Sequence, residues 1–467
     1  MEIIRVGDIR YEEHSNGWNI LYGHKPSSIL LPRTAEEAAS CLRNVIRRKE
    51  KFRIRSGGHD VNGYSAADGV VVIDLRHLDS IDISDDSTQV KFGPAVKFRK
   101  LYPALADRKL VVPAGICDDV AVGGHALGGG NGYLHRFLGA SCDMVIDMKL
   151  IDCHGRLIHA NSKDNPDLFW ALRGAGNANF GMVIEYTYRT TKVEKFSTFA
   201  LTWKWDDYKK TFSQWQNWAP FADTRLTSTF TLYKDEITAM GMFAGPKDQL
   251  MSILPSFISK PSTGKNLSVY EYDRYDLALN ELMSHYVQGD SSVAHEHATF
   301  AAAAAMCNLL DDAALLDFEE VIRKSPGTSS VVFFARGGRI CGVPSDFNAY
   351  RYRSQSLEPM FRTTWKNEGD REGCLNWIID SYRQLKSNFE GVYKNWTYSM
   401  VECGMYDWHG DFIPRLVGTK RNFDPENIFS NPQSLPVYVT QKHISDWDLP
   451  KSVVDILARQ GSLEWRF

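Results

Sequence analysis

The hydrophobic and polar positions of residues 28–80 predict a strand, a helix and two further strands. Residues 51–56 (KFRIRS) alternate polar and apolar side chains, and residues 69–75 (GVVVIDL) form an almost uninterrupted apolar run, as in short strands. Before them, apolar side chains recur at helical spacing behind Thr34, which is suited to cap a helix N-terminus. The glycine-rich loop between the two strands places His59 at the end of a buried strand, where functional groups are often displayed.

The same kind of pattern continues to about residue 195. It predicts strands at 89–96, 110–115, 144–152 and 181–190 and a helix at 165–174, separated by glycine loops. This mixture of short strands and helices predicts an α+β domain.

A second α+β unit is predicted from residue 196 to about residue 410. Long polar and aromatic strands are expected at 228–244 and 329–340, and helices at 248–259, 313–324 and 374–385. The alanine-rich run 299–306 (TFAAAAAM) is expected to form a tight helical turn, because alanine has the highest helix propensity. For residues 437–467 the pattern indicates only an amphipathic surface helix.

Composition and charge restrict the class of protein. The chain has 467 residues, enough for two or three domains, and its 43% hydrophobic and 24% charged residues are typical of packed globular proteins. The 54 lysine and arginine residues against 57 aspartate and glutamate residues leave a net charge of -3, which offers no field to attract nucleic acid. The 12% aromatic content suits the walls of a site for a flat, conjugated ligand.

Targeting signals and metal motifs are not recognised in the sequence. Charges interrupt the apolar residues of the N-terminus, and no apolar run approaches the roughly 18 residues that span a bilayer, so we expect a cytoplasmic protein that binds no membrane. The eight cysteines are scattered without a CxxC pair, which argues against a zinc site or a disulfide framework. His295 and His297 alternate without further ligands, so no metal is expected.

Residues 111–148 are unusually rich in glycine for a region with an apolar pattern. The glycines are Gly115, Gly123, Gly124, Gly128, Gly129, Gly130, Gly132 and Gly139. Because glycine loses the most backbone entropy on folding, this density indicates positive φ angles or a close approach of the main chain to another group. Bare amides can hold phosphate oxygens, yet neither the Rossmann spacing nor a Walker A lysine is present. A pyrophosphate cradle of another kind and a packing loop both remain open.

Cys117 and His125 lie inside this glycine cluster. Asp118 and Asp119 follow Cys117, and negative neighbours raise the pKa of a thiol, so by itself Cys117 is expected to be structural. The glycines near His125 leave its ring accessible, although a lone histidine is more often a satisfied core residue.

Several motifs resemble, in order, those of berberine bridge enzyme-like FAD-linked oxidases of the vanillyl-alcohol oxidase or p-cresol methylhydroxylase (PCMH) type superfamily. They are RSGGHD (55–60), GVVVIDLRHLDSI (69–81), PAGICDDVAVGGHALGGGNGYLHRFLGASCDMVI (113–146), NPDLFWALRGAGNANFGMV (165–183) and RLVGTKRNFDPENIFSNPQSL (415–435). The resemblance implies an α+β protein with a PCMH-type FAD-binding domain and a substrate domain whose antiparallel sheet is covered by helices. The implied boundaries are 1–195 for the FAD domain, 196–414 for the substrate domain, 415–436 for a segment returning to the FAD domain, and 437–467 for an extension.

The resemblance implies that FAD is linked twice, through His59 to the flavin 8α-methyl group and through Cys117 to ring carbon 6. Neutral imidazole and thiolate are suitable nucleophiles for oxidised flavin. His125 matches a family histidine that stabilises the reduced, anionic flavin. Val120 matches a position linked to oxygen access, although a core valine is an equal alternative. The other expected cofactor-binding residues are Arg55, Ser56, Gly57, Gly58, Asp60, Gly63, Gly123, Gly124, Gly128, Gly129, Gly130, Gly132 and Asn395.

The substrate domain departs from the family pattern. Where the family often has a YxNY segment with a catalytic tyrosine, this chain has YKNW at 393–396, so an indole replaces the phenol. On a strand, Trp396 and Tyr398 would share one face and Tyr393 would point away, which makes Tyr398 the candidate for the catalytic hydroxyl.

A family position that often holds glutamate or glutamine also differs. It corresponds to Met360 here, and Glu358, two residues earlier on the same face of a strand, is the candidate base. A solvated surface carboxylate is the alternative for Glu358.

The resemblance and these residues together predict an FAD-dependent oxidase of specialised metabolism with Tyr398, Glu358 and His125 as catalytic residues. Hydride from a small alcohol, amine or activated C–H group passes to the flavin, and O2 reoxidises the flavin to give hydrogen peroxide. A dehydrogenase with another acceptor, a redox-neutral cyclase or isomerase, and a non-catalytic binder are the alternatives. The oligomeric state is left open.

Overall fold

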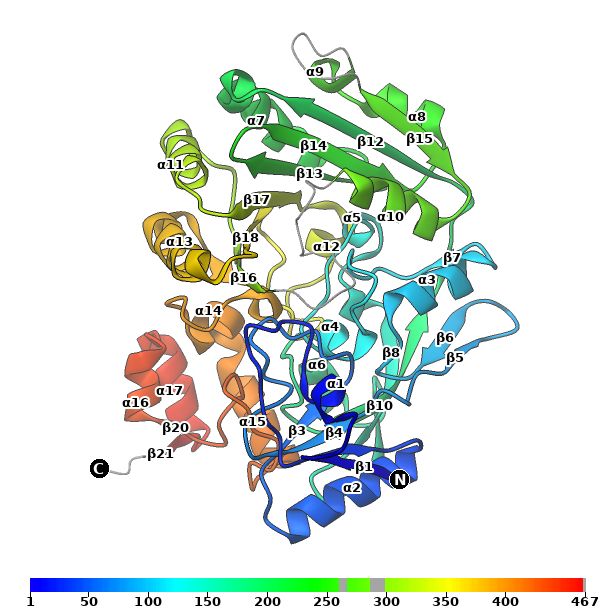
Figure 1. Cartoon of the computed structure of the whole chain (residues 1–467), viewed down its shortest axis with the longest axis vertical. Coiled ribbons are helices and arrows are strands. Elements are labelled where there is room, and N and C mark those ends of the chain that lie inside the picture. Colours follow the sequence, from blue (N-terminus) through cyan, green and yellow to red (C-terminus); the bar gives the residue numbers. More distant parts are fainter. Residues whose placement is uncertain (260–266, 286–298, 465–467) are drawn as a thin grey trace.

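A computed structural model describes residues 1–259, 267–285 and 299–464 of the chain. Two lobes meet across the middle of the molecule (Figure 1). The first lobe contains a four-stranded and a five-stranded sheet, and the second contains an eight-stranded sheet. The two histidines considered as metal ligands, His295 and His297, lie outside the described residues.

The four-stranded sheet carries the loop that holds His59. Its order is β1 (Glu2–Arg5), β2 (Ser28–Leu31), β4 (Val71–Asp74) and β3 (Phe52–Arg55), with β2, β4 and β3 parallel. Parallel strands need a crossover connection, and α2 (Ala35–Arg47) provides it from β2 to β3, which lie on either side of β4. The side chain of Thr34 accepts a hydrogen bond from the backbone N–H of Glu37 at 3.2 Å, which confirms the predicted cap.

The five-stranded sheet is antiparallel throughout. Its order is β5 (Ile81–Ile83), β6 (Gln89–Phe92), β10 (Met182–Arg189), β8 (Val145–Ile151) and β9 (Leu157–Asn161). The strand predicted at 110–115 is shorter than expected, because Pro113 has no N–H to continue a ladder. Only β7 (Leu110–Val111) pairs there, with β11 (Thr191–Lys192). The helices α3 (Phe98–Ala106), α4 (Val122–Leu127), α5 (His135–Leu138) and α6 (Pro166–Leu172) complete this region.

The second lobe is built on one antiparallel sheet of eight strands. Their order is β15 (Ser268–Tyr272), β12 (Phe196–Trp203), β14 (Ile237–Phe243), β13 (Leu226–Tyr233), β17 (Thr328–Ala335), β18 (Leu357–Thr364), β16 (Phe300–Met306) and β19 (Gly391–Val392). Every neighbouring pair is antiparallel, as expected from the family resemblance.

The two faces of this sheet have different neighbours. The helices α7 (Tyr208–Gln216), α11 (Asp312–Arg323) and α13 (Arg371–Leu385) cover the face that carries Phe230, Phe333 and Phe361 (Figure 1). Because side chains alternate along a strand, Phe334 and Glu358 project from the opposite face, toward the first lobe. That alternation brings residues of the sheet to the site described below.

The helical turn predicted for residues 299–306 was wrong. Residues 300–306 form β16, which pairs with β18 on one side and β19 on the other. The alanines from 301 to 305 are fully buried, and their small side chains fit a crowded central strand. Tertiary pairing here overrides the helix propensity of alanine.

The C-terminal part of the chain packs on the first lobe. After α14 (Met405–His409), α15 (Ile413–Phe423) contacts α6, and its buried Lys420 donates hydrogen bonds to the carbonyls of Asn179 at 2.7 Å and Phe429 at 2.6 Å. The single surface helix expected in 437–467 is instead two helices, α16 (Gln441–Asp446) and α17 (Lys451–Arg459), with β20 (Val439–Thr440) and β21 (Leu463–Glu464). Turn residues between them divide the expected helix.

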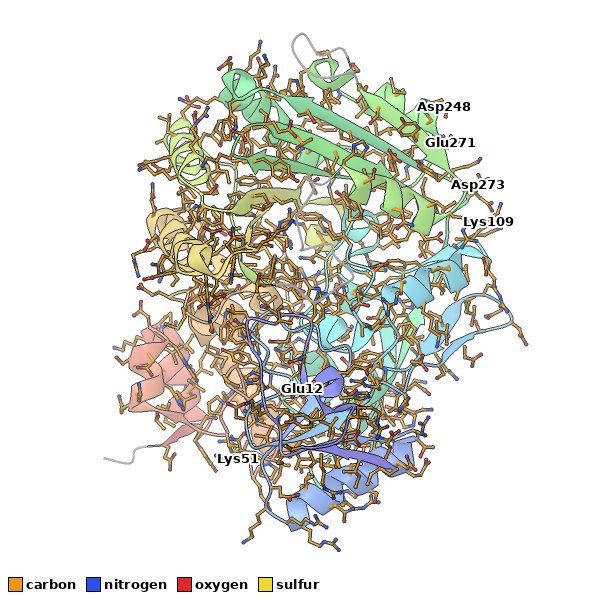
Figure 2. The ribbon with its side chains drawn as sticks, in the orientation of Figure 1. Glu12, Lys51, Lys109, Asp248, Glu271 and Asp273 are labelled. Carbon is orange, nitrogen blue, oxygen red and sulfur yellow. The ribbon has the colours of Figure 1, made fainter. Side chains whose placement is uncertain are left out.

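The other α-helices of the described residues are α1 (Tyr11–Ser15), α8 (Lys247–Ile253), α9 (Ser256–Ser259), α10 (Tyr275–Ser284) and α12 (Gly338–Gly342). Charged side chains such as Lys109, Glu271 and Asp273 lie at the periphery (Figure 2). Lys195 bridges Glu271 at 3.2 Å and Asp273 at 2.5 Å, so neighbouring charges there offset one another.

Across the described ranges, no helix combines the length and the apolar character that crossing a membrane requires. In the same ranges, no group of three or more His, Cys, Asp or Glu residues is placed to hold a metal ion.

Candidate active site

A cavity lies between the two lobes, and both lobes and the C-terminal segment line it. Its wall includes residues 56–60, 115–117, 123–125 and 429–431, together with Val120, Asn131, Phe334, Glu358, Met360, Arg362, Tyr393, Asn395 and Trp396. We call this set of residues the cavity wall. Segments more than 300 residues apart in the sequence therefore form one site.

His59 and Cys117 meet in the cavity wall. The Cys117 Sγ lies 3.6 Å from Nε2 of His59. Nδ1 of His59 has no hydrogen-bond partner among the described residues. Burial lowers the pKa of His59 to about 4, so its imidazole is neutral near pH 7 and keeps a lone pair for nucleophilic attack. Burial, together with the charges of Asp118 and Asp119, raises the pKa of the Cys117 thiol to about 12.

His125 belongs to α4 and is fixed by packing rather than by hydrogen bonds. Its ring meets the ring of Phe98 edge to face, with centroids 5.0 Å apart, and its Nε2 has no partner among the described residues. Burial lowers the pKa of His125 to about 4. Gly130 has a φ of +85°, and a Cβ at that position would lie 2.3 Å from Nε2 of His125. The conformation and the close approach both require glycine at position 130.

The predicted cofactor-binding residues fall into two groups. Those in the cavity wall are Ser56, Gly57, Gly58, His59, Asp60, Cys117, Val120, Gly123, Gly124, His125 and Asn395. Those placed outside it are Arg55, Gly63, Gly128, Gly129, Gly130 and Gly132. Direct contact with the cofactor stays a prediction for both groups.

Arg55 and Asp60 have structural roles in the His59 loop. Nε of Arg55 donates to the Asp74 carboxylate at 2.7 Å, and both side chains are buried. Oδ1 of Asp60 accepts hydrogen bonds from the backbone N–H groups of Asn62 and Tyr64, each at 2.9 Å. Arg55 therefore pairs with a strand residue of its own sheet, and Asp60 folds the loop around itself.

The glycines outside the cavity wall allow close packing of the main chain against neighbouring groups. A Cβ at Gly128 would lie 2.0 Å from Nδ2 of Asn395, and a Cβ at Gly132 would lie 1.9 Å from the Ala114 carbonyl oxygen. Gly63 and Gly129 similarly face the side chains of Tyr22 and Tyr350. For these positions the packing-loop alternative is the one that the structure supports.

Glu358 is a buried member of the cavity wall, so the solvated alternative was wrong. Its side chain is 2% exposed. Oε2 accepts hydrogen bonds from Nδ2 of Asn131 at 2.7 Å and from Nη1 of Arg336 at 3.0 Å. Oε1 accepts none from the described residues. Burial raises the pKa of Glu358, and the Arg336 guanidinium opposes that shift.

The strand expected around Trp396 was wrong, and with it the predicted orientation of two tyrosines. Residues Lys394–Trp396 form a 3-10 helix, in which side chains three residues apart lie on one side. Tyr393 and Trp396 therefore both reach the cavity wall, and the Tyr393 hydroxyl accepts a hydrogen bond from the Gly130 N–H at 3.0 Å. Tyr398 packs in the core beneath the helices and does not line the cavity, which removes the geometric basis for its catalytic role.

Several residues of the site gave no usable signal in the sequence. Trp18 stacks on His59, Arg336 pairs with Glu358, and Asn131 bonds the same carboxylate. None of the three lies close in sequence to the group that it contacts. Arg362 could have been found, because alternation along β18 places it on the face of Glu358 and Met360.

The cavity wall carries unpaired polar atoms that a bound group would satisfy. Nδ1 of His59, Nε2 of His125 and Oδ1 of Asn395 are buried without partners among the described residues. Buried polar atoms are almost always paired in folded proteins, so this set indicates a polar ligand. The main chain at Gly124 is open to the cavity and suits phosphate oxygens, whereas the N–H of Gly123 already donates to the Pro94 carbonyl. His59 and Cys117 are close enough to reach one ring system. These residues fit FAD.

The mixed α+β fold and this wall define a flavin-dependent oxidoreductase. Residues 26–161 match the family described as FAD binding domain, and residues 408–436 match the family described as berberine and berberine like. The chain is an FAD-linked oxidoreductase that is similar, over these two segments, to the berberine bridge enzyme-like proteins of the PCMH-type FAD-binding family.

Known proteins resemble the chain over almost its whole length. The uncharacterized FAD-linked oxidoreductase YgaK of Bacillus subtilis (strain 168) is 27% identical over 446 residues, which cover 93% of this chain and 96% of the relative. Tetrahydroberberine oxidase of Berberis wilsoniae is 27% identical over 468 residues, covering 89% and 86% respectively. The structure of Physcomitrella patens BBE-like 1 has the same fold, with a TM-score of 0.85, 23% identity, and coverage of 94% and 97%.

Proposed function

We propose that the protein is an oxidase that transfers hydride from a small alcohol, amine or activated C–H compound to FAD and returns the electrons to O2 as hydrogen peroxide. The observation that carries the proposal is the presence of a buried carboxylate, Glu358, in the same cavity wall as His59 and Cys117. Glu358 keeps one oxygen without a hydrogen bond from the described residues. Hydride removal from an alcohol or amine needs a base for the accompanying proton.

In this proposal FAD is held by two covalent bonds, one to His59 and one to Cys117. The neutral imidazole and the thiol lie 3.6 Å apart between Nε2 and Sγ, which supports attachment to one ring system. Bound flavin supplies the acceptor for hydride, and covalent attachment favours abstraction from reluctant donors. The residues of this chain bind and orient the flavin and the substrate and move the proton.

Glu358 acts as the base through Oε1. Asn131 and Arg336 both occupy Oε2, so the proton of the substrate goes to the other oxygen. Arg336 stabilises the ionised carboxylate, whereas burial disfavours it, and the balance leaves a base with a raised pKa. Such a carboxylate accepts a proton more readily than a solvated one.

His125 stabilises negative charge on the reduced cofactor. Its pKa of about 4 means that the ring is neutral at physiological pH and donates from one N–H group. Nε2 is buried without a partner among the described residues, which makes it the available nitrogen. Preorganised donors of this kind stabilise developing charge without reorganising solvent.

Dioxygen is the proposed electron acceptor. Val120 lies in the cavity wall beside Cys117, at the position that the family resemblance links to oxygen access. The similarity to tetrahydroberberine oxidase, whose name states an oxidase activity, supports the same class of acceptor here. The mixture of aromatic and polar residues in the cavity wall supports a small organic substrate over a polymer.

The test is a screen of alcohols, sugars and amines with the holoenzyme. The absorbance of the flavin and the amount of hydrogen peroxide formed are measured for each compound. The expected result is bleaching of the flavin by a substrate under anaerobic conditions and recovery of the spectrum, with one peroxide per turnover, when air is admitted. Bleaching with slow recovery in air would contradict the oxidase and identify a dehydrogenase. Product formed without net peroxide or an added acceptor would identify a redox-neutral enzyme.

A further inference from the structure

The N-terminal segment 17–19 holds the loop that carries His59. The backbone N–H of Trp18 donates to the Gly58 carbonyl at 2.9 Å. Nδ2 of Asn19 donates to the Val61 carbonyl at 2.6 Å, and Asn19 is buried. Both sides of His59 are therefore tied to the same short segment, about 40 residues earlier in the chain.

Among the described residues, one ring contact sets the plane of the His59 imidazole. The indole of Trp18 stacks on it with centroids 4.1 Å apart and an interplanar angle of 16°. The hydrogen bonding of the imidazole is weak, because Nδ1 has no partner among the described residues and Nε2 faces only the Cys117 thiol at 3.6 Å. Stacking on Trp18 is thus the principal restraint on the orientation of this ring.

Trp18 is in turn held by the second lobe. Its ring meets Phe300 of β16 at 5.2 Å between centroids, and Phe300 meets Trp396 of the cavity wall at 5.3 Å. Asn19 exchanges hydrogen bonds with the backbone of Phe300, donating to its carbonyl at 2.8 Å and accepting from its N–H at 3.3 Å. Trp18 is therefore wedged between His59 and the sheet, and the indole is only 4% exposed.

We propose that Trp18 is a positioning residue for flavin attachment, which holds the His59 imidazole in the orientation from which Nδ1 bonds the flavin 8-methyl carbon. This inference rests on the covalent attachment in the proposed function. Attachment forms one N–C bond and releases two protons, one from the methyl group and one from the imidazole. Two electrons remain on the flavin, and O2 takes them up with the two protons as hydrogen peroxide.

The experiment compares the flavin bonds of Trp18→Leu, Trp18→Phe and wild-type holoenzyme by peptide mass mapping at His59 and Cys117. The mapping is done on freshly purified protein and during incubation with added FAD in air. Trp203→Leu is the matched control, because Trp203 is equally buried and stacks on Phe230 in the core beneath the helices. Thermal unfolding of each variant reports general damage.

Loss of the ring stack is expected to slow bonding at His59 by about threefold or more in Trp18→Leu, while bonding at Cys117 continues. Trp18→Phe keeps an aromatic face and should restore most of the His59 bond. Equal rates of flavin bonding at His59 in Trp18→Leu and wild type would overturn the positioning role of Trp18. Equal losses of flavin bonding at His59 and Cys117 would overturn it too, and neither result would affect the covalent attachment itself. Wild-type protein without flavin on His59 would overturn the covalent attachment in the proposed function and this inference with it.

Discussion

Arg336 donates a hydrogen bond from Nη1 to Oε2 of Glu358 at 3.0 Å, and both side chains are buried. Two charges removed from water gain little net stability from one another, because desolvation offsets most of their attraction. The Arg336 guanidinium leaves Oε1 of Glu358 available in the cavity wall, so the pair serves catalysis more than stability. It keeps a buried base ionised while the base remains able to take a proton.

Glu358→Gln should lower kcat by about 100-fold or more, because it removes the proposed base and keeps the side-chain volume. Flavin content and thermal stability should remain close to those of the wild type. Glu271→Gln, which changes a peripheral carboxylate (Figure 2), is the control and should leave kcat unchanged. The measurement is the rate of anaerobic flavin bleaching with a substrate from the screen, and unchanged bleaching in Glu358→Gln would exclude it as the base.

Arg336→Met should move the acidic limb of the kcat/KM profile to higher pH by about 1 to 3 units. The direction follows because burial already raises the pKa of Glu358, and loss of the opposing cation raises it further. The base is then protonated, and inactive, up to a higher pH. Arg336→Lys retains a cation and should shift the limb less.

The same Arg336→Met variant should lose more stability at pH 8 than at pH 5. Glu358 has a folded-state pKa above its unfolded value, so its contribution to stability is present at low pH and is lost as the pH rises through the folded value. Without the cation this loss at pH 8 should reach about 3 to 5 kcal/mol. Urea unfolding at both pH values measures it, and adding Glu358→Gln to Arg336→Met should remove the pH dependence.

The two flavin bonds should respond differently to pH. Cys117 has a pKa of about 12, so its thiolate fraction and its bonding rate should rise about tenfold per pH unit between pH 7 and 9. His59 has a pKa of about 4 and stays neutral over that range, so its rate should hardly change. Peptide mapping during incubation with FAD checks both rates, with Cys117→Ala as the control that retains only the His59 bond. Parallel pH dependence at the two residues would contradict the assignment.

Gly130→Ala should destabilise the protein by about 1 to 3 kcal/mol and reduce flavin binding, because alanine is strained at positive φ. The added Cβ would also press on Nε2 of His125. Gly418→Ala is the matched control, since Gly418 lies in α15 outside the cavity wall and a Cβ there meets nothing within 4 Å. Chemical unfolding and flavin absorbance of the two variants decide the outcome, and equal behaviour would show that position 130 tolerates a side chain.

Tyr393→Phe and Tyr398→Phe should separate the two tyrosines. Removing the Tyr393 hydroxyl leaves the buried Gly130 N–H without its acceptor, at a cost of about 1 to 3 kcal/mol, and alters the cavity wall. Tyr398 lies outside that wall, so its variant should keep the wild-type rate. Steady-state kinetics and unfolding of both variants provide the test. A large loss of kcat in Tyr398→Phe with intact stability would restore the role predicted from the sequence.

Local patterns were sufficient where the information was local. The Thr34 cap, α2 and the loop with His59 follow from capping chemistry and strand periodicity over a few tens of residues. Two α+β units followed from the strand and helix patterns, and the antiparallel sheet of the second followed from the family resemblance; the observed sheets agree with both expectations.

The failures occurred where local preference and tertiary environment disagreed. Residues 300–306 have a helical composition and form a buried central strand, because two neighbouring strands supply their hydrogen bonds. Residues 394–396 form a 3-10 turn, which brings Tyr393 into the cavity wall and leaves Tyr398 outside it. No sequence period distinguishes these outcomes over so few residues.

The sequence by itself determined that this protein has bare, glycine-rich loops around one histidine and one cysteine, because those residue types carry their chemistry and conformational freedom wherever they are placed. Only the tertiary structure decided which side chains surround them. The indole of Trp18 stacks on His59, and Arg336 and Asn131 donate hydrogen bonds to Glu358. In each of these contacts the partners come from separate segments of the chain. Such contacts depend on how strands and loops meet in space, and spacing along the chain does not encode them locally.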